Sequence, residues 1–68
     1  MTHEKAEKIA RRNAAQDGHP FLFGRLPTKA QDEDQQWEIC NAFDLSKRNQ
    51  LIPPVYEILP AGVKRQIR

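Results

Sequence analysis

Residues 37 to 45, with the sequence WEICNAFDL, place apolar side chains at positions 37, 39, 40, 42 and 43. On a helical wheel these positions spread over more than half of the circumference, which is too wide for packing against one neighbour. We therefore expect this stretch to belong to a helix and to form the centre of the hydrophobic core.

The residues before this stretch predict where that helix begins. Thr28 and Gln31 have the spacing of a capping box, and the acidic side chains at 32 to 34 suit the positive end of a helix dipole. The pattern therefore predicts a helix that begins near Lys29 and covers residues 29 to 44. Residues 46 to 50 either continue this helix or form a separate turn.

A second helix is predicted over residues 3 to 16. Ala, Glu, Lys, Arg and Gln fill most of this range, and Gly18 stands where a helix would end. Ile9 is its only large apolar anchor. Glu4 with Lys8, and Glu7 with Arg11, have the acid-first order that stabilises a helix at i,i+4 spacing.

Two further segments are predicted to be extended. Pro20 and Pro27 disfavour helix in the residues that precede them, so residues 20 to 26 are expected to form a short strand or a packed loop. Residues 52 to 59 suit either a short strand or one helical turn. Pro60 can open a last short helix that runs to Arg68.

These elements predict an α-rich small domain that occupies residues 1–68 as one unit. Two main helices, at 3 to 16 and 29 to 44, would dominate it, and the two extended segments would at most pair as a minimal two-stranded sheet. Leu, Ile, Val and Phe together make up 15 of the 68 residues. A chain this short buries only about 60% of its unfolded surface, which excludes a large internal substrate cavity.

Catalytic and metal-binding patterns are absent from the sequence. His3, His19 and Cys40 lack the close spacing of zinc ligands, and Ser46 has no glycine elbow. We therefore expect neither an enzyme nor a metal or cofactor site. A non-enzymatic binding or regulatory protein, which acts through surface contacts with another macromolecule, is the function that remains.

The charges are segregated along the chain, although the formal net charge is only +2. Residues 1 to 30 have six basic and three acidic side chains, residues 31 to 45 have five acidic and none basic, and residues 46 to 68 have five basic and one acidic. Either the acidic middle neutralises the two ends within the fold, or the ends form a positive surface for an anionic partner.

The candidate binding residues are the cations of the two ends. They are Lys5, Lys8, Arg11, Arg12, Lys64, Arg65 and Arg68. A protein partner is the first expectation. The alternative is sequence-independent binding of nucleic acid through phosphate contacts, since no aromatic residue is interleaved with these cations to stack on bases.

Other features of the sequence predict the setting and the assembly. The lone cysteine, Cys40, cannot form an intrachain disulfide, and the longest uncharged run is too short for a membrane span, so we expect a cytoplasmic protein without membrane contact. A small core with widely spread apolar residues predicts a homodimer. Trp37 is expected to be largely buried, with Phe43 or Phe21 nearby.

Residues 53 to 56 spell PPxY, a pattern that resembles the ligands of WW domains. Such ligands dock an exposed polyproline II segment on an aromatic groove. The competing interpretation is that the prolines shape the backbone and Tyr56 packs into the core. We favour the second interpretation because the chain has few other large apolar residues.

Overall fold

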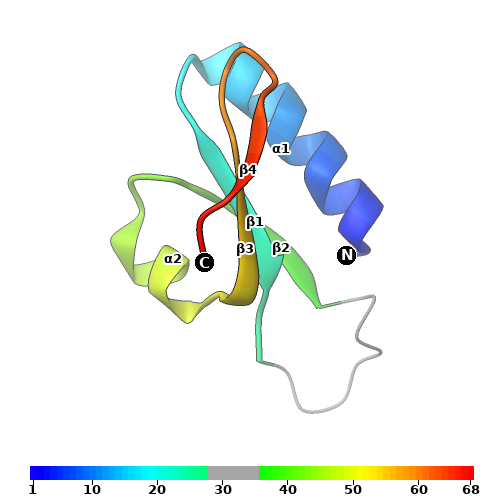
Figure 1. The fold of residues 1–68 in the computed structure, drawn as a ribbon, viewed down its shortest axis with the longest axis vertical. Helices are drawn as coiled ribbons and strands as arrows, with labels where there is room; N and C mark the ends of the chain where they lie inside the picture. The colour runs from blue at the N-terminus through cyan, green and yellow to red at the C-terminus, as the bar shows by residue number, and fades with distance from the viewer. Residues whose placement is uncertain (28–35) are drawn as a thin grey trace.

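The computed structural model describes residues 1–27 and 36–68, and within them the chain forms an antiparallel sheet with one long helix against it (Figure 1). The elements are α1 (His3–Asp17), β1 (Phe21–Arg25), β2 (Trp37–Asn41), α2 (Leu45–Gln50), β3 (Ile52–Ile58) and β4 (Lys64–Gln66). The strands lie in the order β2-β1-β3-β4, and each neighbouring pair is antiparallel. The protein is thus a small α+β domain, and the prediction of an α-rich domain with at most two strands is wrong.

Helix α1 confirms the helix predicted over residues 3 to 16. The Thr2 side chain caps its first turn by accepting a hydrogen bond from the Lys5 backbone N–H. Gly18 ends it with a left-handed φ of 74°, a conformation that glycine adopts without strain. The residues that face the sheet are small and fully buried: Ala6, Ala10 and Ala14.

The second predicted helix, over residues 29 to 44, is wrong wherever the structure describes it. Its first part falls in residues 28–35, outside the described residues, and the part at 37–41 is strand β2. Trp37 and Ile39 pack with the α1 side of the core, whereas Cys40 packs on the opposite side. Both faces of β2 are covered, so its apolar side chains point alternately into two cores. On a helical wheel such a strand gives the same wide apolar arc as a buried helix.

A turn and a short helix follow β2. The Asn41 side chain accepts a hydrogen bond from the Phe43 N–H at 2.9 Å, and Asp44 caps the N-terminus of α2 by accepting from the Lys47 N–H. Residues 46 to 50 therefore belong to a separate helix. Phe43 lies in the turn with 72% of its surface exposed, so it does not contribute to the core as the sequence predicted.

The two predicted extended segments are both strands. Residues 20 to 26 contain β1, and residues 52 to 59 contain β3, and the two strands pair side by side in the middle of the sheet. The last helix predicted after Pro60 is absent from the described chain. Gly62, with a φ of 94°, lies in a turn that reverses the chain into β4.

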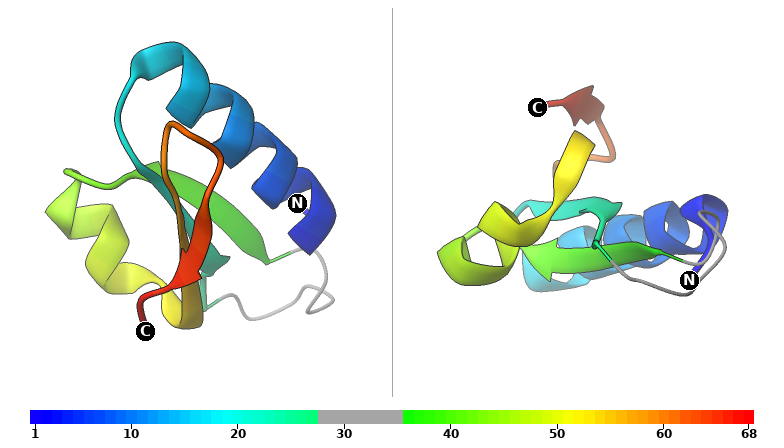
Figure 2. Two further views of the ribbon diagram at one scale, coloured as in Figure 1. Left: turned by 45° about the horizontal axis from the view of Figure 1, so that its top comes forward. Right: turned by 90° about the horizontal axis from the view of Figure 1, so that it is seen from below.

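The sheet separates two hydrophobic clusters. Helix α1 covers one face of the sheet (Figure 2). The cluster under α1 consists of Ala6, Ala10, Ala14, Phe21, Phe23 and Ile58. The cluster on the opposite face consists of Leu22, Cys40, Ala42, Leu51 and Val55. The sheet thus has a core on each face, and we call the face that α1 covers the α1 face.

Trp37 and Tyr56 lie at the rim of the α1 face, and both are half-buried. The Trp37 ring contacts the His3 ring, with centroids 4.5 Å apart, and lies 6.0 Å from Phe23. Trp37 therefore packs against the cluster that contains Phe21, as a partly buried residue, whereas the other expected neighbour, Phe43, is exposed. Tyr56 of β3 stacks on Phe23 of β1, with ring centroids 5.2 Å apart. This agrees with the interpretation that Tyr56 of the PPxY pattern packs against the core.

Candidate functional site

Three of the predicted binding residues lie along one side of α1 and are exposed: Lys5, Lys8 and Arg12. Their spacing of three and four positions places them on neighbouring turns, about 10 Å from first to last at 1.5 Å per residue. In the described part of the chain none of them forms an ion pair; the predicted pair of Glu4 with Lys8 does not form. We call these three residues the basic face of α1.

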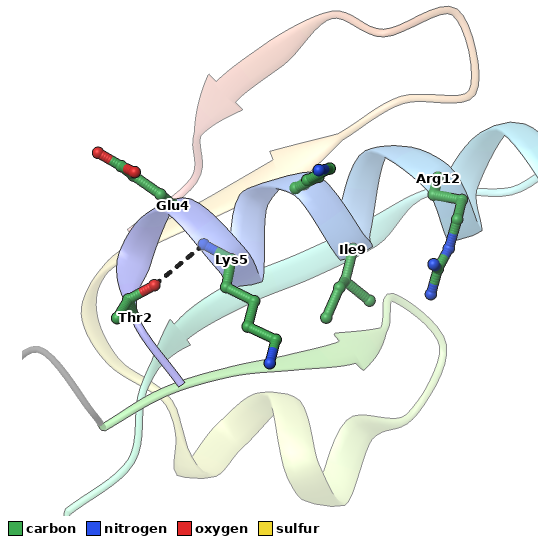
Figure 3. Close-up of a pocket in the computed structure, with 6 residues that line it drawn as sticks. Thr2, Glu4, Lys5, Ile9 and Arg12 are labelled. Carbon is green, nitrogen blue, oxygen red and sulfur yellow. Dashed lines mark hydrogen bonds between the residues drawn. The ribbon is translucent and has the colours of Figure 1, made fainter.

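The basic face borders a shallow, open hollow on the surface. Its lining residues are Thr2, Glu4, Lys5, Lys8, Ile9 and Arg12. Figure 3 shows Lys5 and Arg12 extending from the same side of α1, with Ile9 between them and β2 running below. The half-buried Ile9 therefore gives this positive surface an apolar centre.

Two other predicted residues, Arg11 and Lys64, are bound within the fold. Both contact Glu7 of α1, Lys64 Nζ at 2.9 Å and Arg11 Nη2 at 3.1 Å. Arg11 also donates a hydrogen bond to the Gly62 carbonyl, and Lys64 lies 4.6 Å from the centre of the Tyr56 ring. The hydrogen bond from Lys64, together with the neighbouring Arg11, lowers the pKa of Glu7 below 4.5. These cations hold α1 against the β3–β4 hairpin.

The last two predicted residues, Arg65 and Arg68, lie elsewhere. Arg65 pairs with Glu57, and Arg68 donates to the Leu51 carbonyl. Successive side chains of a strand point to opposite faces, so Lys64 and Arg65 of β4 separate onto the two faces of the sheet. The seven predicted residues therefore do not form one surface, because Lys64 and Arg65 belong to strand β4 and Arg68 follows it, and none of the three lies on the predicted helix.

The groups with potential for chemistry are few in the described part of the chain. No cluster of three His, Cys, Asp or Glu side chains that would suit a metal ion occurs in residues 1–27 and 36–68. Cys40 is buried, and burial raises the pKa of its thiol above 9.0. A protonated, enclosed thiol is a poor nucleophile, so the geometry around Cys40 suits packing.

The outer edge of β2, which lies beside the basic face, was not predicted from the sequence. β2 is the first strand in the order β2-β1-β3-β4, so one side of it has no neighbouring strand among the described residues. The signal for it was the alternation of Trp37 and Ile39 with Glu38 and Cys40, which has the period of a strand. On a helical wheel the same residues spread over a wide arc, which led to the prediction of a helix in place of a strand.

Comparison with known proteins adds no relative: the chain matches no protein-family model, no curated protein and no solved structure. Among the described residues, no helix combines the length and apolar character that crossing a membrane requires.

Proposed function

We propose that this chain is a non-enzymatic binding protein that contacts an acidic surface of a partner protein through the basic face of α1. One observation carries the proposal. Lys5, Lys8 and Arg12 are exposed without an ion pair in the described structure, whereas Arg11, Lys64 and Arg65 are bound to acidic side chains of the fold. Exposed, unpaired cations on one side of a helix attract a partner of opposite charge.

The form of this surface favours a protein partner over nucleic acid. The basic face has only three cations, and Glu4 lies in the same hollow. Its centre is Ile9, an aliphatic side chain, and none of the described residues that line the hollow has an aromatic ring that would stack on a base. A small apolar centre with a charged rim is typical of protein interfaces.

The experiment compares two anionic polymers as ligands of the unmodified protein. Binding of poly-L-glutamate and of a generic DNA duplex is measured by fluorescence anisotropy between 50 and 300 mM salt, a range of about sixfold. We expect salt-sensitive binding of poly-L-glutamate and weaker binding of the duplex. Stronger binding of the duplex, with a slope of log affinity against log salt near −2.7 for about three phosphates, would replace the proposal by the nucleic-acid alternative. Absence of binding to either polymer at low salt would contradict both.

Three remaining expectations accompany this proposal. A regulatory role follows if the partner is itself active, and a cytoplasmic setting suits the lone, buried Cys40.

The homodimer remains a prediction, but for a different reason. The apolar side chains of β2 are covered by two cores, so they do not call for a second copy. Among the described residues, Phe43 and Leu45 are the large apolar side chains left most exposed. Multi-angle light scattering measures the oligomeric state directly.

A further inference from the structure

The register of the sheet determines which backbone groups of β2 point away from it. Gln36 and Ala42 form backbone hydrogen bonds on the β1 side: the Leu26 N–H donates to the Gln36 carbonyl at 3.0 Å, and the Ala42 N–H donates to the Pro20 carbonyl at 3.2 Å. Residues of an antiparallel strand alternate in this respect. Ile39, an odd position between them, therefore points its N–H and its carbonyl toward the open edge.

The start of this edge is already extended by another segment of the chain. The Trp37 N–H donates to the Met1 carbonyl at 3.1 Å, and the Met1 nitrogen donates to the Trp37 carbonyl at 3.2 Å. Met1 thus pairs with Trp37 as a residue of an added antiparallel strand would. At the other end of β2 the Asn41 carbonyl accepts from the Asp44 N–H. Between these ends, at Ile39 and at the Asn41 N–H, the outward backbone groups have no hydrogen-bond partner among residues 1–27 and 36–68.

We infer that the edge of β2 at Ile39 accepts an extended acidic segment of the partner protein as an added strand, under the basic face of α1. This inference rests on the proposed function and specifies the form of its ligand. Backbone hydrogen bonds to Ile39 would supply the pairing, as in other complexes formed by strand addition. Lys5 and Arg12, which extend over the β2 side of α1, would meet the side chains of the added strand (Figure 3).

The alternation of a strand gives the ligand a charge pattern. Every second side chain of an added strand lies on the α1 face, about 7 Å from the next, and those positions suit Glu or Asp beside the cations of α1. The intervening side chains lie on the other face, where β2 presents Glu38. The binding segment is therefore expected to alternate acidic with uncharged residues.

Charge also argues against a second copy of this chain as the occupant. Pairing of two β2 edges about a two-fold axis would bring the basic face of one copy toward that of the other. Like charges at close range oppose such pairing, and in the described chain neither Lys5 nor Arg12 has an acidic partner to offset the repulsion. An acidic strand from another protein reverses the sign of this interaction.

Two synthetic peptides of equal composition test the pattern. One alternates Glu and Thr over eight residues, and the other has its four Glu residues together, followed by its four Thr. Titration into the ¹⁵N-labelled protein is followed by NMR, with hydrogen exchange of the Ile39 amide as the second readout. We expect the alternating peptide to bind about tenfold more tightly and to slow exchange at Ile39, because strand pairing protects that amide.

A backbone-modified peptide separates strand addition from attraction between charges alone. N-methylation of every second residue of the alternating peptide, at the amides that would face β2, removes the hydrogen bonds and keeps all charges. The inference predicts about a tenfold loss of affinity. If both acidic peptides and the methylated peptide bind equally and the Ile39 amide still exchanges freely, strand addition is wrong while the proposed function stands. If none of them binds, the proposed function itself fails.

Discussion

Glu7 of α1 accepts a hydrogen bond from Lys64 of β4 at 2.9 Å, across 57 positions of sequence. The contact joins the helix to the outermost strand of the sheet on the side opposite β2. Arg11 supports it from the same helix through Glu7 and the Gly62 carbonyl. This cluster positions α1, and it withdraws two of the cations that the sequence offered for binding.

The pairing of Glu7 with Lys64 is expected to stabilise the fold only while Glu7 is ionised. The folded-state pKa of Glu7 lies below 4.5, so the contribution is complete above that pH and is lost as the pH falls through the lowered pKa. A double-mutant cycle with Glu7→Gln and Lys64→Gln should give a coupling of about 0.2 to 1 kcal/mol at pH 7 in urea unfolding. The coupling should decrease as the pH falls through the lowered pKa of Glu7. A coupling that is unchanged by acid would contradict the assignment.

The alanine side of α1 is expected to tolerate no larger residue. Ala10 is fully buried against the sheet, so Ala10→Leu should lower the free energy of unfolding by about 1 to 3 kcal/mol through overpacking. Ala15, on the exposed side of the same helix, is the matched control, and Ala15→Leu should change stability by less than about 0.5 kcal/mol. Equal effects in thermal or urea unfolding would show that α1 does not pack as described.

Gly24 of β1 is expected to resist replacement because of its two neighbours on the second core. A Cβ at this position would lie 3.3 Å from both the Leu51 Cβ and a methyl of Val55, and both side chains are buried. Gly24→Ala should therefore cost about 1 kcal/mol or more. Adding Val55→Ala should make the two changes less than additive, since the second removes the methyl that the first meets. Strict additivity in urea unfolding would indicate that the contact is absent.

Trp37 is expected to contribute less than a fully buried aromatic residue. It is half-buried at the rim of the α1 face, whereas Phe23 beneath it is fully buried. Phe23→Ala should cost about 3 to 5 kcal/mol, and Trp37→Ala should cost less than about 3 kcal/mol. The native fluorescence emission of Trp37 should lie between the values for buried and for water-exposed indole. An emission maximum typical of a fully buried ring would contradict its placement at the rim.

The sequence predicts the segments whose local signals agree with their final structure. Residues 3 to 16 are rich in helix formers and are followed by Gly18, and α1 ends at Asp17 with Gly18 as its C-cap. Residues 20 to 26 and 52 to 59 are bounded by prolines, and they contain the two central strands. In these cases the composition of the segment and the Gly or Pro residues that bound it are enough to predict its secondary structure, without knowledge of its tertiary contacts.

The rest depends on contacts that are distant in sequence. The five residues of β2 have apolar side chains on both faces because each face meets a different core, and a pattern of this length does not distinguish such a strand from a buried helix. β4 has three residues, all exposed, and pairs with β3 without any apolar alternation.

The candidate site follows the same division between local and distant contacts. The basic face can be read from the i, i+3 and i+7 spacing of Lys5, Lys8 and Arg12 along one helix. The sequence does not reveal that Lys64 is absent from the site, because only the tertiary fold brings its partner Glu7 to it. The ion pairs of the described chain use Glu7 and Glu57, so neither Glu38 nor Asp44 of the acidic stretch neutralises the ends by a direct ion pair.

The most direct test of the proposed function compares two double variants of equal net charge in calorimetric titration with poly-L-glutamate. Lys5→Gln with Arg12→Gln removes two charges of the basic face, and Lys47→Gln with Arg65→Gln removes two charges from α2 and β4. Circular dichroism would first establish that both variants fold. The first variant should bind at least about fivefold more weakly than the unmodified protein, and the second should stay within about twofold of it. Equal weakening in both variants would mean that net charge alone attracts the polymer, and it would contradict a binding site on α1.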